Sequence, residues 1–458
     1  MSERWDAIVI GGGPAGSTAG SLLAKAGRRV LVLEKAPFPR HHIGESLLPG
    51  LSPLFKRLGV VGDLRRAKFF VKTGGSYLWG RSRAPWSITF ADLEEAPGYM
   101  VGRDETWAWH VERARFDELL LNAARRRGAV VRQPASVLDV ALSGGRVDGL
   151  SVRGPDGRTR TERAALYLDA SGQAGLLASR LGWRRFDGQL RNMAVYTYYE
   201  GARLFTGPRR NHIFIENIED GWVWFIPLSE RRVSVGVVTS LSNAPQARAG
   251  LEAFFLARLA RTKEASARTA KARRVEPFRL ERDWSYRSRR FAGENFLLLG
   301  DAAAFIDPLL SYGVTLAMHS AELAADCADG ALAAPAKREA LFAHYDAAHG
   351  ARFDELRDFT KFFYDGNRRR ESYFWKARRI ADHAKNRYAK AAFTFLVSGH
   401  PHWDSLYARG YFKRFFSPLG VPARLRRDRR FLAALAASGR PDLALIDDPL
   451  PEPRKRAA

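Results

Sequence analysis

The residues near the N-terminus that are best suited to chemistry form a glycine-rich turn. Gly11, Gly13 and Gly16 have the spacing Gly-x-Gly-x-x-Gly. The first glycine permits a tight turn, the second lets the backbone approach a pyrophosphate, and the third allows close contact between helix and strand. The N-terminus of the following helix favours an anion there. Glu34 is placed to accept hydrogen bonds from a ribose, although a carboxylate at a strand end is often simply solvated. The expected dinucleotide contacts are Gly11, Gly13, Pro14, Ala15, Gly16, Glu34 and Lys35.

These residues need a strand, a helix and a second strand to hold them in place. Ala7–Ile10 is a short apolar run, Ser17–Ala26 is rich in helix formers, and Val30–Leu33 is a second apolar run. This order predicts one β-α-β unit over residues 7–34. The context favours dinucleotide binding over a glycine-rich turn without a ligand. No second unit of this kind follows in the sequence.

A second glycine motif lies much further along the chain and indicates which dinucleotide is bound. Leu299–Ala303 reads Leu-Gly-Asp-Ala-Ala and leads into a helical stretch. It resembles the Gly-Asp motif of FAD-dependent enzymes such as the aromatic hydroxylases, in which the aspartate binds a ribityl hydroxyl. Residues 111–117 and 169–172 resemble two further landmarks of that superfamily. The resemblance implies FAD rather than NAD, with Arg113, Gly300 and Asp301 among its contacts.

Residues 222–227 resemble the Trp-x-Trp-x-Ile-Pro signature of one branch of this superfamily, the flavin-dependent halogenases. Residues two apart on a strand share a face, so Trp222, Trp224 and Ile226 form one bulky wall that ends at Pro227. Such a wall can keep an organic substrate away from the flavin while a small anion passes. The alternative is two core tryptophans and a proline that ends a strand.

Residues 305–313 resemble the second signature of that branch, Phe-x-x-Pro-x-x-Ser-x-Gly. A turn followed by a helix presents backbone N–H groups, which are the donors that a halide needs. The resemblance implies that Ser311, Tyr312 and Gly313 hold chloride or bromide beside the flavin, and that Pro308 and Gly313 contact the cofactor. The alternative is a plain flavin-contacting turn without a halide.

Residues 69–77, preceded by Gly44–Pro49, look like the segment that carries the essential lysine of these halogenases, and Lys72 is the matching residue. Reduced flavin and oxygen convert halide to hypohalous acid, which must be held and oriented. An ammonium group can hydrogen-bond it, or an amine can form a haloamine. Glu45 and Ser46 of the preceding segment are expected to contact the cofactor. Without this context, Lys72 would be interpreted as an ordinary solvated charge.

The sequence departs from the family pattern at one position that bears on the substrate. Tryptophan halogenases carry a glutamate in Pro-x-Glu-Ser-x-Gly, and the matching residue here is Leu310. This resembles members that act on phenols or pyrroles, which react without that carboxylate. We therefore expect a phenol or pyrrole, free or tethered to an acidic acyl or peptidyl carrier protein.

The net charge of +25 is the main compositional oddity, and much of it is concentrated late in the chain. Lys361–Arg430 contains 18 Lys and Arg against 5 Asp and Glu, interleaved with aromatic residues. The favoured interpretation of this segment is a helical region with solvated arginines. The second is a surface that binds an acidic protein partner. Binding of nucleic acid is the least favoured, because no RRM, zinc-finger or basic-zipper spacing is present. The single cysteine, Cys327, excludes internal disulfides, and the ten histidines have no metal-ligand spacing.

The whole sequence predicts an α/β protein with a Rossmann-type FAD-binding domain of the aromatic hydroxylase type, an inserted β-sheet substrate domain and an α-helical C-terminal region. Val130–Arg132, Val137–Leu142 and Arg146–Val152 are expected to form a meander with a turn at Gly144-Gly145. The expected boundaries are 1–75, 111–182 and 291–330 for the FAD-binding domain, 76–110 and 183–290 for the substrate domain, and 331–458 for the basic helical region.

The resulting hypothesis is a halogenase that takes reduced FAD from a separate flavin reductase and uses O₂ and chloride or bromide. A monomer or homodimer in the cytoplasm is expected, because no apolar run reaches membrane-spanning length and the N-terminus lacks a signal peptide. Nucleic acid is not an expected partner. The first rival is an FAD-dependent monooxygenase or oxidoreductase of the same fold without halogenating activity. The second is a non-catalytic binding protein that uses the basic segment.

Overall fold

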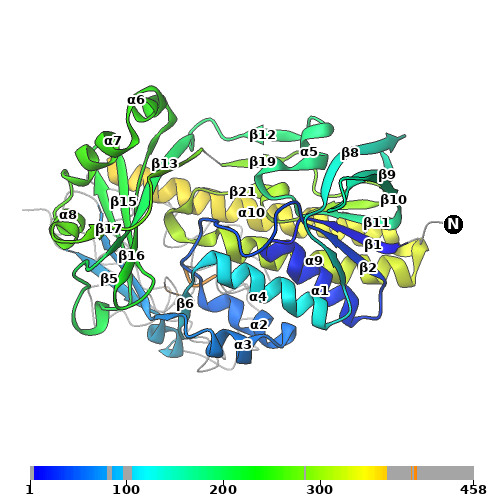
Figure 1. The fold of residues 1–458 in the computed structure, drawn as a ribbon, viewed down its shortest axis with the longest axis horizontal. Helices are drawn as coiled ribbons and strands as arrows, with labels where there is room; N and C mark the ends of the chain where they lie inside the picture. Colours follow the sequence, from blue (N-terminus) through cyan, green and yellow to red (C-terminus); the bar gives the residue numbers. More distant parts are fainter. Residues whose placement is uncertain are drawn as a thin grey trace, which may run out of the picture.

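The computed structural model describes residues 5–79, 85–95, 106–282, 285–368, 394 and 397–399. A five-stranded parallel sheet lies at one end of the molecule and an eight-stranded sheet at the other, with the long helix α10 (Arg338–Arg368) running between them (Figure 1). This arrangement confirms the predicted α/β class.

The parallel sheet positions the first motif. Its order is β20-β11-β1-β2-β7, and Ile10 at the end of β1 pairs with Leu33 of β2 and Asp169 of β11. The carboxyl ends of these parallel strands therefore meet at one edge, where Gly11, Glu34 and Ala170 follow them. The strands are β1 (Trp5–Ile10), β2 (Val30–Leu33), β7 (Val130–Arg132), β11 (Ala164–Asp169) and β20 (Phe296–Leu298), and the helices α1 (Pro14–Lys25), α4 (Arg113–Arg126) and α9 (Tyr312–Ala333) pack in this part of the molecule.

The predicted meander is wrong in one of its three strands. β8 (Ser136–Ser143) and β9 (Arg146–Arg153) form the expected antiparallel hairpin, and Gly144 and Gly145 both adopt positive φ at its turn. β7 instead pairs in parallel with β2, and β10 (Thr159–Glu162) is the third strand of the meander. β7 follows α4 in a crossover back to the parallel sheet, and the apolar pattern of a short strand does not specify which sheet it joins.

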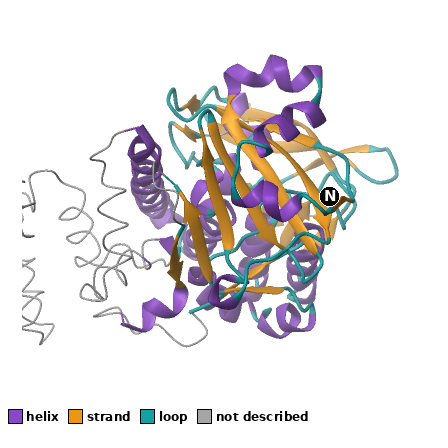
Figure 2. Ribbon diagram, turned by 90° about the vertical axis from the view of Figure 1, so that its left-hand side faces the viewer, coloured by secondary structure: helices purple, strands orange, loops and turns teal. Residues whose placement is uncertain are grey.

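The larger sheet has the order β17-β13-β16-β15-β14-β4-β5, with β18 also paired to β13. Figure 2 views the molecule from this side and shows its strands side by side. Its strands are β4 (Gly74–Leu78), β5 (Trp86–Thr89), β13 (Asn192–Glu200), β14 (Ile213–Ile218), β15 (Gly221–Pro227), β16 (Arg232–Ser240), β17 (Arg273–Arg274) and β18 (Arg279–Arg282). The strands predicted around residues 214–216, 222–227 and 233–238 are confirmed.

The two faces of β15 belong to two different cores. Trp222, Trp224 and Ile226 join the core that also contains the parallel sheet. Val223 and Phe225 join a separate core, in which residues of α7 (Leu251–Leu259) and α8 (Glu264–Thr269) are packed. This alternation is the period of two expected for a strand buried on both faces.

A small two-stranded sheet places the predicted lysine segment. β3 (Phe70–Lys72) pairs antiparallel with β6 (Ala108–His110), and Ser46 forms a bridge with His110. The segments around residues 46, 72 and 110 therefore lie together. The remaining elements are α2 (Ser52–Leu58), α3 (Val61–Arg66), α5 (Leu176–Arg180), α6 (Ala244–Ala249), β12 (Arg184–Phe186), β19 (Tyr286–Ser288) and β21 (Ala304–Phe305), with 3-10 turns η7 (Gly300–Ala302) and η8 (Pro308–Leu310).

The end of the described chain is helical, as expected. α9 and α10 cover most of residues 312–368. The basic segment beyond residue 368 lies almost entirely outside the described residues. Among the residues described, none of the helices combines the length and hydropathy needed to cross a membrane. The same ranges hold no cluster of three or more His, Cys, Asp or Glu side chains suited to a metal ion.

Candidate active site

The turn between β1 and α1 accepts only glycine at two positions. Gly11 has a φ of +105°, and a Cβ there would lie 2.3 Å from the Ala170 carbonyl oxygen. A Cβ on Gly16 would lie 1.8 Å from the Gly11 oxygen. Gly13, at the N-cap of α1, offers no side-chain cap, and the first turn of this helix has no acidic residue. The turn therefore leaves the positive end of α1 available to an anion.

Glu34 has a structural role that the sequence did not reveal. Its carboxylate accepts hydrogen bonds from the backbone N–H of Gly12 at 2.7 Å and of Ala36 at 2.9 Å. The side chain is also buried. Its hydrogen bonds therefore fix the glycine turn against the end of β2. A carboxylate has about four acceptor positions, so two such bonds leave capacity for a ribose hydroxyl. The neighbouring Lys35 is exposed.

Gly300 marks the place where α1 and α9 approach η7. Its φ is +52°, and a Cβ there would lie 3.2 Å from Ala15 and 3.0 Å from Ala317. The N–H of Gly300 donates to the Ser320 hydroxyl of α9 at 2.9 Å. The next residue, Asp301, has a carboxyl whose pKa burial raises to about 7. The first and last cofactor motifs thus lie next to one another.

Arg113 connects these motifs to the segment that precedes Lys72. At the start of α4 it forms a two-pronged ion pair with Asp117, with distances of 2.7 and 3.0 Å, and it also donates to the Ile43 carbonyl. Its charge lowers the pKa of Asp301 and of Glu45 against the larger effect of burial. The predicted residues Asp301 and Glu45 therefore both lie within electrostatic reach of Arg113.

Glu45 and Ser46 are both buried. Burial raises the pKa of Glu45 to about 7, opposed by hydrogen bonds with Ser234 and Tyr198 and by nearby arginines. One carboxylate oxygen of Glu45 and the Ser46 hydroxyl have no hydrogen-bond partner among the described residues. Buried polar atoms without partners are rare and are typical of sites that bind a ligand or water.

Lys72 points into the protein rather than into solvent. Its side chain is 2% exposed, and Nζ donates to the Leu47 carbonyl oxygen at 2.9 Å. The amine also lies 5.3 Å from the centre of the Phe90 ring. Burial lowers the pKa of Lys72 to about 7, so neutral amine is abundant near pH 7. The Gly44–Pro49 segment and the lysine segment, which are adjacent motifs in the prediction, are therefore in direct contact.

Two histidines near Lys72 were missed by the sequence analysis. His212 Nδ1 hydrogen-bonds to Ser76 Oγ at 2.9 Å, and His110 Nε2 hydrogen-bonds to the Asn211 carbonyl at 3.1 Å. Burial, followed by the charge of Lys72, lowers the pKa of both rings, that of His212 to about 4. Both are therefore neutral near pH 7. These two histidines are far apart in the sequence, so no local spacing pattern indicates that both lie near Lys72.

The tryptophan pair of β15 is buried, with ring centres 6.0 Å apart. Trp222 Nε1 donates to the Tyr364 hydroxyl at 2.7 Å, and Trp224 Nε1 donates to the Ser234 hydroxyl at 3.1 Å. Gly236 of β16 pairs with Trp224, and a Cβ on Gly236 would lie 2.1 Å from its indole. We call Trp222, Trp224 and Ile226 the tryptophan wall.

The 305–313 loop runs from β21 through η8 into the N-terminus of α9. Asp307 Oδ1 accepts the backbone N–H of Leu309 at 3.0 Å, which caps η8. Ser311 has a φ of +61° and forms the N-cap of α9 without a side-chain hydrogen bond to the helix. Tyr312 is buried, and the nearby hydroxyl of Tyr77 adds to the effect of burial in raising its pKa. The loop therefore lies close to β4, the strand that follows Lys72.

These contacts bring together most of the predicted site residues, but they do not join Lys72 to the 305–313 loop. The glycine turn, Gly300 and Arg113 lie together, and Lys72 is in contact with the segment that carries Glu45. No described contact joins Lys72 directly to Tyr312 or Gly313. A passage between them along the tryptophan wall stays a prediction.

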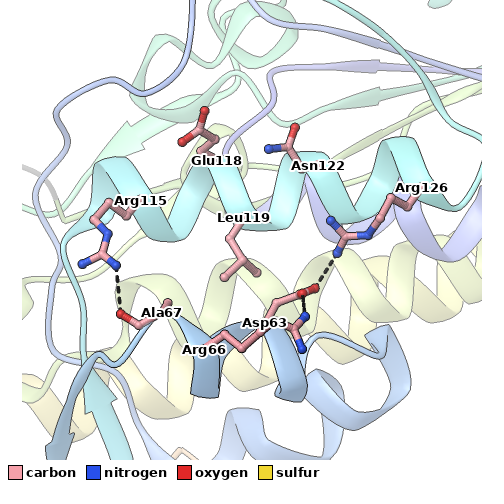
Figure 3. Close-up of a pocket in the computed structure, with 8 residues that line it drawn as sticks. All are labelled: Asp63, Arg66, Ala67, Arg115, Glu118, Leu119, Asn122 and Arg126. Atoms are coloured by element: carbon pink, nitrogen blue, oxygen red, sulfur yellow. Dashed lines mark hydrogen bonds and ion pairs between the residues drawn. The ribbon is translucent and has the colours of Figure 1, made fainter.

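A shallow surface pocket lies elsewhere, between α3 and α4 (Figure 3). Asp63 forms ion pairs with Arg66 and Arg126 there, and Arg115 donates to the Ala67 carbonyl at 2.8 Å. The pocket contains none of the predicted site residues. Because Asp63 and these arginines already have ion-pair or hydrogen-bond partners in the protein, the pocket is not our candidate for the active site.

Comparison with known proteins decides the family. The family model described as tryptophan halogenase matches residues 6–107 and 101–431. The chain belongs to this family of flavin-dependent halogenases. It is 36% identical over 379 residues to a tryptophan 2-halogenase of Chondromyces crocatus, covering 82% of this chain and 70% of that protein.

Two further similarities support the assignment of this halogenase. It is 34% identical over 365 residues to a 1H-pyrrole-2-carbonyl-[peptidyl-carrier protein] chlorinase of Pseudomonas fluorescens, covering 76% of this chain and 80% of that protein. The structure of the myxobacterial chondrochloren halogenase CndH, an FAD-dependent enzyme, is similar with a TM-score of 0.76 and 35% identity, covering 89% and 93% of the two chains. The prediction of an FAD-dependent halogenase fold is confirmed.

The residues of this halogenase fit a bound FAD. The steric restriction at Gly11 and Gly16, the uncapped N-terminus of α1 and the remaining acceptor capacity of Glu34 suit the dinucleotide portion. The buried polar atoms of Glu45 and Ser46 that have no partner suit a polar group of the ligand. A carboxyl at Asp301 with a pKa raised to about 7 by burial can accept or donate a hydrogen bond.

Proposed function

We propose that this halogenase uses reduced FAD, O₂ and chloride or bromide to halogenate a phenol or pyrrole ring, with Lys72 directing the oxidised halogen to the substrate. The observation that carries the proposal is the buried amine of Lys72. Lys72 lies in the segment that resembles the family's lysine segment, and its Nζ donates a hydrogen bond to the Leu47 carbonyl. A lysine with only a surface role would keep its amine in water.

FAD would be held by the glycine turn, Glu34, Lys35, Arg113 and the Gly300-Asp301 motif, with Glu45, Ser46 and Pro308 as further contacts. When bound in its reduced form, FAD would supply the two electrons that reduce O₂ to the peroxide level. Oxygen at that level can oxidise halide by two electrons to hypohalous acid, with water as the other product. The N–H groups at the start of α9, at Tyr312 and Gly313, with Ser311, would hold the halide, since the first N–H groups of a helix have no acceptor within it.

Lys72 would then hold the hypohalous acid at its Nζ atom. As an ammonium it would donate a hydrogen bond to the oxidant. As a neutral amine it would attack the halogen and form a haloamine, while the oxygen–halogen bond breaks and the hydroxide leaves with the amine proton as water. The pKa of about 7 makes both forms available near neutral pH. The neighbouring rings of His110 and His212 are neutral there and add no charge that would compete for the oxidant.

The tryptophan wall would keep the organic substrate apart from the flavin. Both indoles are buried, and each indole N–H has an acceptor within the protein. The wall therefore has its polar atoms satisfied without a ligand, which suits a barrier better than a binding surface.

The substrate class rests on Leu310. This residue is buried and apolar where tryptophan halogenases carry a glutamate, and an electron-rich phenol or pyrrole needs no such carboxylate. Of the two relatives, one is named for tryptophan and the other for a pyrrole on a peptidyl carrier protein. We favour the pyrrole or phenol class, with a carrier-bound substrate and a separate flavin reductase.

Replacement of Lys72 by alanine tests the proposal. The wild-type protein, supplied with a flavin reductase, bromide and an activated phenol, is expected to form brominated product. Lys72→Ala should lower the yield of that product at least about a hundredfold, while FAD binding and NADH consumption stay close to wild type. Lys56→Ala, at an exposed lysine of α2, is the matched control and should retain activity.

Two outcomes would contradict the proposal. Brominated product from Lys72→Ala at the wild-type level would remove the assigned role of the amine. Hydroxylated product from the wild-type protein, with bromination at background, would favour the monooxygenase rival.

A further inference from the structure

Tyr364 on α10 joins the tryptophan wall to the 305–313 loop. Its hydroxyl oxygen lies 2.7 Å from Trp222 Nε1 and 2.8 Å from Asp307 Oδ2. Asn192 of β13 donates from Nδ2 to Asp307 Oδ2 at 2.8 Å and to the Tyr364 hydroxyl at 3.2 Å. Tyr364, Asp307 and Asn192 have no function predicted from the sequence.

The chemistry of the groups fixes the direction of these hydrogen bonds. An indole N–H can only donate, so the Tyr364 oxygen accepts the bond from Trp222. The hydroxyl proton of Tyr364 is then available to Asp307, whose carboxylate also accepts from Asn192 and from the backbone N–H of Leu309. Each donor in this network therefore has an acceptor, and Asn192 Nδ2, which carries two hydrogens, has two.

Because these groups are buried, the loss of one of their hydrogen bonds would be costly. The side chains of Trp222 and Asp307 are almost completely shielded from water. Burial raises the pKa of the Asp307 carboxyl, and the donors Asn192 and Tyr364 oppose that shift. Water cannot replace a missing donor at such a position without rearrangement of the chain.

The consequence follows from where Asp307 lies. Its other carboxylate oxygen caps η8, which leads through Ser311 into the N-terminus of α9. A rotation of the Asp307 side chain would therefore move the turn that presents the N–H groups of Tyr312 and Gly313. Trp222 is held at the other end of the same chain of bonds.

We propose that Tyr364 is a positioning residue that holds the proposed halide-binding turn in register with the tryptophan wall. The inference rests on the proposed function, because it assigns the halide to the 305–313 loop. It gives α10 a specific role: through Tyr364, this helix sets the geometry of the halide site from outside it.

Tyr364→Phe tests this role because it retains the ring, which packs edge-on against Trp79, and removes only the hydroxyl. Tyr345→Phe is the matched control, since it removes a buried tyrosine hydroxyl from the same helix. For each protein the KM for bromide and kcat are measured at saturating reduced FAD. In addition, the rise in Tm with bromide is recorded without turnover, at constant ionic strength.

Tyr364→Phe is expected to raise the bromide KM, and the bromide concentration for half of the Tm rise, about fivefold, as for the loss of one buried hydrogen bond. Its kcat at saturating bromide should stay within about twofold of wild type. Tyr345→Phe should leave both bromide values unchanged. Asp307→Asn should raise them as well, and the double variant with Tyr364→Phe should show less than the product of the two effects, because both changes break the same bond.

The failures of the two proposals are distinguishable. If wild type brominates its substrate and Tyr364→Phe matches Tyr345→Phe in both bromide values, the positioning role is overturned and the proposed function stands. If wild type yields no brominated product but shows a bromide-dependent Tm rise that Tyr364→Phe weakens, the proposed function fails and the positioning role holds. Absence of any bromide-dependent Tm rise in wild type overturns the positioning role.

Discussion

At the scale of single residues, Lys72 carries the most unusual chemistry in the structure. Within the described part of the chain, its amine has no carboxylate partner and donates to the backbone carbonyl of Leu47 in the interior. Such a position disfavours the charged form, which is why burial lowers its pKa to about 7. Burial of this amine therefore lowers folding stability at pH values where the unfolded chain would carry the charge.

This cost predicts a pH-dependent difference between wild type and Lys72→Met. From about pH 7 to 10 the unfolded wild-type chain binds more protons at this lysine than the folded protein does. The free energy of unfolding of wild type should therefore rise relative to the variant, by up to about 1.4 kcal/mol per pH unit. Urea unfolding of both proteins at pH 7 and pH 9 measures the change.

Neighbouring groups do not obscure this comparison. The pKa values of His110 and His212 are lowered below the range of the experiment, so neither ring changes its charge in the folded protein there. Glu45, whose pKa burial raises to about 7, titrates in wild type and variant alike, so its contribution cancels in the difference between them. A difference in unfolding free energy that is the same at both pH values would show that the amine keeps its ordinary pKa.

At the scale of elements, β15 carries the tryptophan wall and the neighbouring strand β16 makes room for it. β15 supplies the two indoles, and Gly236 of β16 supplies the space that the indole of Trp224 fills. A glycine inside a strand commonly marks a close approach of this kind. The wall is therefore a property of the strand pair rather than of the Trp-x-Trp sequence alone.

Gly236→Ala should disturb this wall. The added methyl would lie 2.1 Å from the indole of Trp224, so the ring or the strand must shift. We expect a loss of stability of about 1–3 kcal/mol, as for overpacked cores, and a lower yield of halogenated product per NADH consumed. Thermal unfolding and product analysis measure the two effects.

A second substitution shows whether the indole is the cause. In Gly236→Ala/Trp224→Leu the smaller side chain makes room for the methyl group. The double variant should therefore be more stable than the sum of the two single changes predicts. Additive losses would place the strain elsewhere in the strand.

At the scale of the whole molecule, the candidate site is assembled from segments that are far apart in the chain. The cofactor motifs come from the ends of β1, β11 and β20, Lys72 comes from β3, and the wall comes from the larger sheet. α10 spans these parts, with Tyr345 bonded to β20 and Tyr364 to β15. The arrangement explains why a helix late in the sequence is in contact with both functional regions.

The net charge of +25 gives a prediction at the same scale. If the substrate arrives on an acidic carrier protein, kcat/KM for the carrier-bound ring should fall on the order of tenfold between about 50 and 300 mM salt, while the free ring shows little change. Arg424, Arg426 and Arg427 replaced by serine should reduce this salt dependence. The same change at the exposed Arg153, Arg158 and Arg163 is the control.

The carrier hypothesis has a clear contrary result. Equal activity on free and carrier-bound substrate, insensitive to salt, would remove the carrier protein from the proposal. The bromination assay with Lys72→Ala is independent of that outcome.

The local features of this protein could be predicted from its amino-acid pattern. The β-α-β unit, the shared face of Trp222 and Trp224, the hairpin at Gly144-Gly145 and the two long helices follow from patterns over a few residues. The family resemblance carried by the ordered motifs was confirmed as well. Each of these depends on neighbours in the chain, which the sequence shows directly.

Contacts between distant groups could not be predicted from the sequence and are seen in the folded protein alone. The tertiary structure placed β7 in the parallel sheet, closed Glu34 over the glycine turn, and buried the amine of Lys72 against Leu47. It also joined Tyr364 to Trp222 and Asp307. The physical reason is that burial and hydrogen-bond partners depend on packing between elements, and the pattern of residues within each element does not encode which element it will meet.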